Sequence, residues 1–403
     1  MLPRGMAGRL TLDFLKTESA AGLAPVGAAA VALVLANSPL AGDYFGFLAR
    51  PITFQLAGFI HTASVESWVK DGLMTAFFLV IGLEIKFEVL RGELSSPRRL
   101  ATPVLAAMGG MVVPALIYLA FNLGPGGARQ GWPTPVATDV AFALAALTVV
   151  APKMPPSLRL FLLTLAIADD MGAVALIGVL YTTQLHWAAV AGAAAVLAML
   201  ALLSRFKRAP LLLYAVGFAV VWGFCLKSGI NTSVAGVACA LTVPIGARRA
   251  GGESLLTQFM DAIHPWVAYG VLPLFAFTAA GFSLAGLAGR DIVSPVAVGV
   301  ALALLVGKPL GVFGVSVLAA VTRIGRRPTG STWLELLGVA ALTGVGFTMS
   351  LFLGGLAFGD GDTVAQAQVR LGVIAGSLAS VALGGALLSR AKSRRDAAGE
   401  EAR

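Results

Sequence analysis

Two adjacent carboxylates, Asp169 and Asp170, lie inside an apolar stretch that runs from Leu160 to Tyr181. The stretch is about as long as the ~20 residues that an α-helix needs to cross a bilayer. An ionisable side chain at membrane depth costs ~2.5–3.5 kcal/mol on insertion scales, and such residues mark ion pathways and proton relays. A soluble helix with two exposed aspartates is disfavoured, because the flanking residues leave no polar face. The pair therefore predicts a site that holds an ion or a proton within a membrane.

The oxygen atoms of this pair suit a small, hard cation, because such cations prefer carboxylate, hydroxyl and carbonyl ligands. The chain has only 3 histidines and 2 cysteines, so softer transition metals are not expected. Two close buried carboxylates titrate as a coupled pair. A site of this kind takes either protons or a cation, and their competition exchanges one for the other. Because successive helical residues point ~100° apart, we expect one aspartate to meet the cation and the other to lie nearer a lysine.

Further charged residues lie at membrane depth. Lys308 is surrounded by apolar sequence, and Thr138 and Asp139 follow Pro133 and Pro135. Broken backbone at this depth is tolerated only where it lines a cavity or is covered by protein. We expect broken helices here, with Asp139 balancing half-helix N-termini and Lys308 balancing C-termini. Alternatively, Lys308 pairs with an aspartate of the central pair.

The composition is that of a membrane protein. Of 403 residues, 58% are hydrophobic and only 12% are charged, and the mean hydropathy is +0.86. Soluble domains carry roughly 25% charged residues. The net charge of +9 comes from small scattered groups of basic residues, which suit membrane topology better than nucleic acid. We therefore expect a single membrane transport domain over residues 1–403.

The predicted fold class is an all-α polytopic membrane protein with about twelve transmembrane helices. The spans lie near 19–37, 68–90, 101–123, 134–150, 157–181, 187–204, 210–227, 230–247, 255–286, 293–322, 333–358 and 364–389. Residues 40–62 form a non-helical stretch, for which a short β-hairpin and an ordinary loop are equally good interpretations. Residues 390–403 form a charged tail.

The distribution of basic residues predicts the topology. Of 29 Lys and Arg residues, 22 fall on one side of the predicted spans and 6 on the other, with Lys308 inside a span. Basic residues concentrate on the cytoplasmic side, which places both termini there. The fourth span has its prolines, and the eleventh is interrupted around Gly344 and Gly346. Interrupted segments at matching places indicate inverted-topology repeats, which we place at about 101–181 and 293–389.

Eight stretches of the sequence are characteristic: 77–86, 137–144, 166–173, 226–229, 264–269, 272–277, 307–311 and 344–350. In these stretches the sequence resembles the NhaA family of bacterial sodium/proton antiporters. The stretches occur in family order across nearly the whole chain, and together they are highly specific.

The resemblance implies an electrogenic secondary transporter, not an enzyme, in the bacterial inner membrane. It would expel Na⁺ or Li⁺ in exchange for a larger number of protons, and no cofactor is expected. Cation and proton binding would fall to Asp169 and Asp170, with Thr138 as a further cation ligand and Asp139 and Lys308 in the crossed-helix assembly. A homodimer would form through an extracytoplasmic hairpin, here 45–58. The resemblance also implies pH regulation, for which the candidate residues are Glu84, Glu88, Asp261 and His264.

The chain departs from the family pattern at two places. Met260 and Asp261 stand where an acid–histidine pair is expected, and Asn231 stands where a histidine can occur. These changes do not touch the residues expected to bind the cation, and they bear on the pH threshold. His264 taken alone could equally cap a helix start before Pro265.

Three other functions compete with cation exchange. An organic-anion carrier would favour helix N-termini without a double aspartate. An intramembrane aspartyl protease would use the Gly-Asp-Gly-Asp motif at 359–362, but the chain contains no Tyr-Asp partner motif, so we interpret it as a turn. A scaffold without transport would leave the buried charges unexplained.

Overall fold

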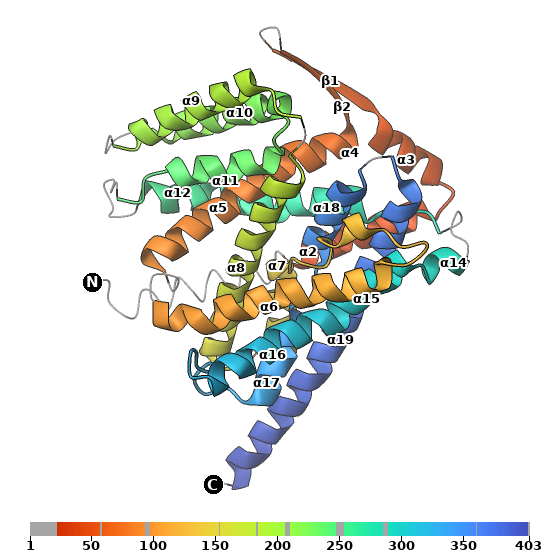
Figure 1. Ribbon diagram of the computed structural model, residues 1–403, viewed down its shortest axis with the longest axis vertical. Helices are drawn as coiled ribbons and strands as arrows, with labels where there is room; N and C mark the ends of the chain where they lie inside the picture. The colour runs from red at the N-terminus through yellow and green to blue at the C-terminus, as the bar shows by residue number, and fades with distance from the viewer. Residues whose placement is uncertain are drawn as a thin grey trace. The chain divides into compact units, whose positions relative to one another are not determined.

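Helices make up most of the chain (Figure 1). The computed structural model describes residues 22–56, 59–92, 97–152, 154–182, 184–205, 210–246, 254–284, 289–359 and 361–401. The helices are α2 (Leu23–Ala36), α3 (Ala41–Ala49), α4 (Val65–Trp68), α5 (Met74–Arg91), α6 (Pro97–Asn122), α7 (Val140–Val150), α8 (Pro156–Leu180), α9 (Trp187–Leu203), α10 (Leu211–Ser228), α11 (Thr232–Thr242), α12 (Leu255–Trp266), α13 (Leu272–Ala280), α14 (Gly289–Ile292), α15 (Pro295–Leu302), α16 (Lys308–Val321), α17 (Trp333–Leu342), α18 (Phe347–Phe358) and α19 (Thr363–Glu401). Short helical turns are η1 (Val69–Leu73), η3 (Arg129–Gly131), η4 (Val267–Val271) and η5 (Ala303–Gly307).

The helices have the lengths and composition of a multi-pass membrane protein. Six of the described helices are long and apolar enough to cross a bilayer, or up to eight if each of two bent pairs counts as one span. All twelve predicted spans contain helical structure, and the all-α polytopic class is confirmed. The fourth predicted span differs in extent, because α7 begins only at Val140. Residues 390–401, predicted as a charged tail, continue α19 as helix.

Of the two interpretations left open for residues 40–62, the hairpin is the one observed. Its bounds differ from the 45–58 that the resemblance implies, because residues 45–49 belong to α3 and the second strand continues to Ser64. Strand β1 (Pro51–Leu56) pairs antiparallel with β2 (Phe59–Ser64), with Pro51 opposite Ser64 and Leu56 opposite Phe59. Residues 57–58 lie outside the described residues. The prediction of a non-helical stretch over 40–62 is wrong at α3. This helix forms because Tyr44 and Leu48, one turn apart, are buried against Ala32 and Ala36.

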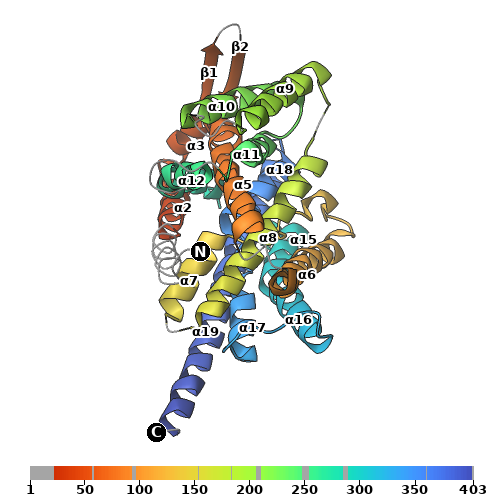
Figure 2. The same ribbon diagram turned by 90° about the vertical axis from the view of Figure 1, so that its left-hand side faces the viewer.

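The described chain divides into two compact units. The first comprises Met1–Gly27, Ser96–Gly172 and Phe282–Arg403, and the second comprises Ala28–Ser95 and Ala173–Gly281. In the second unit α5 packs on α11, and α9 lies beside α10 (Figures 1 and 2). In the first unit α6 packs on α16, and α19 packs on both α15 and α17.

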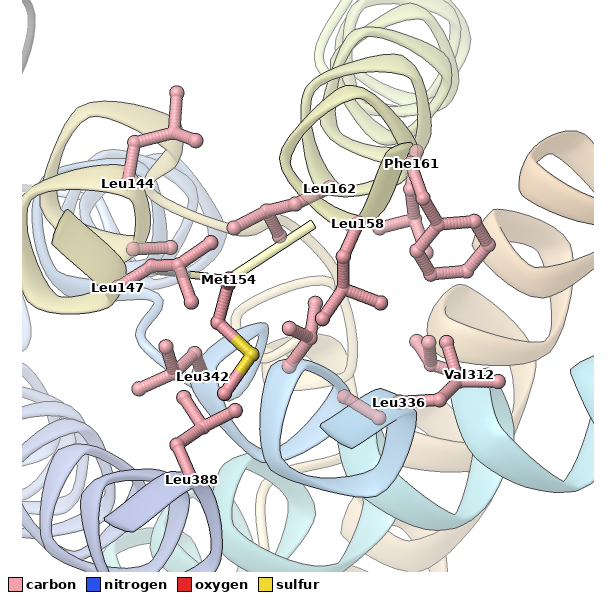
Figure 3. Packing of buried hydrophobic residues seen from close by; sticks show 14 of the residues in the cluster. Leu144, Leu147, Met154, Leu158, Phe161, Leu162, Val312, Leu336, Leu342 and Leu388 are labelled. Atoms are coloured by element: carbon pink, nitrogen blue, oxygen red, sulfur yellow. The ribbon is translucent and has the colours of Figure 1, made fainter. Parts of the chain in front are cut away.

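A buried apolar cluster holds the helices of the first unit together (Figure 3). Leu158 and Leu162 lie one turn apart on the same face of α8. They pack with Leu147 of α7, Leu342 of α17 and Leu388 of α19. This cluster fixes the part of α8 that precedes Asp169 against the helices that flank both interrupted segments.

Close backbone contact between α6 and α16 positions Lys308. A Cβ atom added to Gly311 would lie 2.1 Å from the Gly109 carbonyl oxygen, and one added to Gly109 would lie 2.5 Å from the Gly311 carbonyl oxygen. Small residues permit this approach, because association inside a bilayer depends on close packing. Lys308 lies one turn before Gly311, directly after the π-helical turn η5.

Candidate functional site

The chain before α7 forms successive turns over residues 132–136 and ends in a charged helix cap. Pro133 and Pro135 lie in this segment, where their missing N–H groups cost no helical hydrogen bond. Asp139 is the N-cap of α7, and its Oδ1 accepts a hydrogen bond from the Phe142 amide at 3.2 Å. The interruption predicted in the fourth span is therefore a non-helical segment whose end is marked by Asp139.

The eleventh predicted span is also interrupted. Helices α17 and α18 are bent by 45° relative to one another across residues 343–346. The glycines there are required by close packing, because a Cβ on Gly344 would lie 2.4 Å from the Leu304 carbonyl oxygen. Both interruptions lie in the first unit.

The two interrupted segments are joined by hydrogen bonds. The Asp139 amide donates to the Val345 carbonyl at 2.7 Å. The Asp139 Oδ2 atom accepts from the Thr348 amide at 3.1 Å and from its hydroxyl at 2.5 Å. One carboxylate therefore caps the N-terminus of α7 with Oδ1 and the N-terminus of α18 with Oδ2. The partial positive charge of both helix ends stabilises it.

Lys308 forms a buried ion pair with Asp169. Its Nζ lies 2.5 Å from Asp169 Oδ2, and both side chains are fully buried. The Thr138 hydroxyl lies 2.7 Å from the same carboxylate oxygen and 3.0 Å from Lys308 Nζ. Lys308 also donates to the Val136 carbonyl. Of the two partners predicted for Lys308, the aspartate is the one observed. The carbonyl group that Lys308 contacts belongs to Val136, in the turns before α7.

Thr138 connects the ion pair to the second interruption. Its hydroxyl lies 2.9 Å from the Thr343 carbonyl oxygen, in the residue that follows α17. The C-terminal end of α17 is thus contacted by Thr138. The sequence predicts Lys308 as the residue that balances such an end.

Asp170 lies next to this ion pair on α8 and is 5% exposed. Lys308 interacts with Asp170 electrostatically and with Asp169 by direct contact. With Asp139, which is 7% exposed, the described part of the site contains three carboxylates and one ammonium group. Uncompensated buried charge is costly, so this arrangement favours binding of a cation or of protons.

No group of three or more His, Cys, Asp or Glu side chains that could hold a metal ion is found among the described residues. A cation bound at the aspartate pair would therefore complete its coordination with hydroxyl, carbonyl or water oxygens, as small hard cations do. Thr138 and the carbonyl groups of the interrupted segments supply such atoms.

The four candidates for pH regulation lie in the second unit. Glu84 and Glu88 are one turn apart on α5, and both are half-buried. Exposed Asp261 and half-buried His264 lie on α12, which packs on α5. The alternative role of His264 as the cap of a helix start is wrong, because α12 begins after Ser254, whose side chain is its N-cap.

Asn231, which stands where the family can have a histidine, also has a capping role. Its side chain accepts a hydrogen bond from the Ser233 amide and caps α11.

Sequence reasoning missed several participants in the site. From the sequence, no role is assigned to Thr348, which lies in the similar stretch 344–350, or to the carbonyl groups of Val136, Thr343 and Val345. Every residue has a backbone carbonyl, so the residue types do not show which carbonyl groups contact the site. The hydroxyl of Thr348 could have been found, because it lies two residues after the second glycine of the break and so in the first turn of the next half-helix.

The Gly-Asp-Gly-Asp motif lies away from these groups in sequence and has a capping role where it is described. Asp362 Oδ1 accepts from the Ala365 amide at 3.0 Å and caps α19. Gly359 has a positive φ of 61° at the end of α18, a conformation that favours glycine. Asp360 lies outside the described residues.

Buried opposite charges at the meeting point of two interrupted helices are typical of ion-coupled membrane carriers. Residues 12–388 match the family model described as "Na+/H+ antiporter 1". The chain belongs to this family of transporters.

Curated relatives agree with the family assignment. The protein named Na(+)/H(+) antiporter NhaA from Rhodospirillum rubrum is 46% identical over 379 residues, covering 93% of this chain and 95% of that protein. Na(+)/H(+) antiporter NhaA 2 from Pseudomonas syringae pv. syringae is 46% identical over 377 residues, 94% of each chain. Na(+)/H(+) antiporter NhaA from Paramagnetospirillum magneticum is 46% identical over 381 residues, covering 94% of this chain and 96% of that protein.

Proposed function

We infer that the protein exchanges Na⁺ for protons across the bacterial inner membrane, and we propose that the exchange takes place at Asp169 and Asp170. The observation that carries the proposal is the buried group of three carboxylates and one ammonium at the interrupted helices. An organic anion would meet a surplus of negative charge there. A scaffold without transport does not require a buried ion pair, whose desolvation costs free energy.

The three carboxylates have different roles in this proposal. Asp139 is structural, because its two oxygens cap two helices. Asp169 alternates between Lys308 and the cation, and Asp170 binds the cation directly, with Thr138 as a further ligand. Li⁺ is accepted with Na⁺, because it is also a small, hard cation.

Each cycle moves net charge, because more than one proton exchanges for one cation. Lys308 carries one of these protons: when Asp169 turns to the cation, the ammonium loses its nearest counter-charge, and a desolvated lysine titrates readily. The alternative is that Asp169 and Asp170 carry both protons and Lys308 is structural.

The remaining features of the transporter follow from sequence and family resemblance. Both termini lie in the cytoplasm, as the 22 basic residues against 6 indicate. The repeats 101–181 and 293–389 are related by inverted topology, which the matching interruptions support. Two copies associate through the hairpin, expected at 45–58 and formed by β1 and β2, whose strands expose Ile52, Phe54 and Ile60. Glu84, Glu88, Asp261 and His264 adjust activity to pH.

The central test is cation exchange in everted vesicles or proteoliposomes. Na⁺ or Li⁺ should dissipate an imposed pH gradient, and K⁺ should have little effect. Absence of any Na⁺ or Li⁺ response between about pH 6 and 9 would refute cation–proton exchange, since the competition of protons and cation for buried carboxylates requires one. A parallel measurement on Asp170→Asn tests the proposed site separately.

A further inference from the structure

The C-terminal helix α19 supports the interrupted span along its whole length. It is continuous over Thr363–Glu401, whereas its neighbours α17 and α18 are bent by 45°. The two views show α17 beside α19 (Figures 1 and 2). Close approaches run in antiparallel order: Gly338 to Leu388, Gly344 to Ser380, Phe347 to Ser377, and Gly354 to Val369. Helix α19 therefore spans the break and packs against the helices on both sides of it.

Hydrogen bonding and close packing couple α19 to the break itself. The Phe347 amide, in the first turn of α18, donates to the Ser377 hydroxyl at 3.3 Å. A Cβ on Gly344 would lie 2.4 Å from Ser380 Oγ. Movement of α19 would thus change the backbone that contacts Thr138 and Asp139.

An ion pair joins α19 to the start of α17. Arg395 Nη2 lies 3.0 and 3.1 Å from the two carboxylate oxygens of Glu335, which is fully buried. The same nitrogen donates to the Gly330 carbonyl at 2.7 Å. Glu335 also completes a capping box with Thr332, accepting from its amide at 2.7 Å. Arg395 therefore holds both the first turn of α17 and the loop that precedes it.

The same loop contacts the helix that carries the aspartate pair. Ser157, in the first turn of α8, donates its hydroxyl to the Thr329 carbonyl at 2.6 Å. The segment 329–335 thus connects the starts of α8 and α17 to the end of α19.

The far end of α17 contacts the site. Helix α17 has only ten residues, so it spans about 15 Å. Its next residue, Thr343, contacts Thr138, and the Val345 carbonyl accepts from the Asp139 amide. A short helix moves as a unit, so a shift at Glu335 is transmitted to the groups that contact Asp169.

We propose that Arg395 and Glu335 form a clamp that sets the position of α17 and thereby the affinity of the site for Na⁺. Both are positioning residues that do not touch the ion. The inference rests on the proposed function, because it takes the aspartate pair as the cation site. Arg395 is 41% exposed, so the clamp is open to control by whatever binds or displaces the end of α19.

The test uses variants that remove the charge and keep the helix cap. Glu335→Gln retains an oxygen acceptor for the capping box, which accepts either Glu or Gln. Arg395→Gln removes the other partner, and Arg394→Gln removes the same charge from an exposed neighbouring residue. Folding should survive, because Arg327 stacks on Trp333 at 5.1 Å and also holds the first turn of α17.

Everted vesicles of each full-length variant give the half-saturating Na⁺ concentration and the maximal rate separately. We expect Glu335→Gln and Arg395→Gln each to raise the half-saturating concentration about fivefold, the low end of typical coupling between sites, because one partner is exposed. The double variant should show the same rise, because the two residues act as one unit. Arg395→Lys should fall between, because lysine keeps the positive charge but carries it on a more strongly hydrated ammonium group at the end of a flexible chain. Arg394→Gln should match the wild type.

Three results would overturn the clamp. One is a half-saturating concentration in Arg395→Gln and Glu335→Gln equal to that of Arg394→Gln. Another is a double variant whose shift is the product of two independent shifts. The third is a fall in maximal rate or thermal stability with unchanged Na⁺ affinity, which would indicate a merely structural role. Asp170→Asn is measured in the same vesicles: sodium-dependent exchange in that variant contradicts the proposed site, whatever the clamp variants show.

Discussion

Asp139 caps two helices with two different oxygens, which gives a sharp prediction for Asp139→Asn. Aspartate and asparagine are about equally good at an ordinary N-cap. Here Oδ1 accepts from Phe142 of α7 and Oδ2 accepts from Thr348 of α18. An asparagine has only one oxygen acceptor, and its NH₂ group would face the donors of one helix. The substitution therefore leaves one buried helix N-terminus without its acceptor.

The magnitude can be worked from these contacts. Loss of hydrogen bonds to a charged acceptor costs about 1.5–3 kcal/mol. Loss of the carboxylate from two partly positive helix ends costs about 1–2 kcal/mol more in a buried setting. We expect Asp139→Asn to lower stability by about 3 kcal/mol, or roughly 6 °C in Tm at ~2 °C per kcal/mol. The half-saturating Na⁺ concentration should rise while exchange persists.

The matched control is Asp362→Asn. Asp362 also caps a helix, but a single oxygen accepts from a single amide, that of Ala365. Asparagine can fill that role, so the control should stay within about 1 °C of the wild type. The assay is thermal unfolding in detergent at fixed pH and salt, together with vesicle exchange. Equal Tm values for the two variants would refute the double-cap argument. Complete loss of cation binding in an Asp139→Asn protein of normal stability would instead make Asp139 a direct ligand.

Three further predictions concern the ion pair and its neighbour. Asp170→Asn should abolish Na⁺-dependent exchange, because it removes a charge that the desolvated ion requires; wild-type turnover in vesicles would show that the site is misplaced. Asp169→Asn should be nearly as damaging to exchange and should also lower Tm, since breaking a buried ion pair costs about 3–5 kcal/mol. Adding Lys308→Gln should recover part of that Tm, and a Tm loss equal to the sum of the single losses would contradict the pairing. If Lys308 carries a proton, Lys308→Gln alone should retain some exchange but without net charge movement. Exchange that is still driven by voltage in clamped proteoliposomes of this variant would show that Lys308 is not in the proton path.

Much of the fold could be predicted, because hydropathy indicates which stretches are long enough to cross a membrane as helices. Apolar stretches of membrane length appear as helices, and prolines and glycines mark both interruptions. The prediction of non-helical structure at α3 is wrong because its nine residues are rich in aromatic residues and glycine, a composition typical of loops. Only the packing of Tyr44 and Leu48 onto α2, which is tertiary, makes them helical.

The site could be predicted as a set of residues but not as a set of contacts. Asp139, Asp169, Asp170 and Lys308 stand out because a charge in an apolar stretch is conspicuous, whatever its partner. The sequence left open which aspartate meets Lys308, since a pair of adjacent residues on a helix differs only in direction. That choice depends on where α16 lies, and the contact between Gly109 and Gly311 fixes its position.

The same reasoning explains why the charge balance could not be read from residue types alone. By count, three acids and one base leave a deficit of two positive charges. In the structure, part of that deficit is met by backbone dipoles at the starts of α7 and α18, which the sequence shows only as a helix cap and a break. Because Asp139 is balanced in this way and Asp169 is balanced by Lys308, the remaining demand for positive charge falls on the aspartate pair as a whole. In the proposed exchange, a monovalent cation or protons meet this demand, and they compete because both bind the same carboxylates.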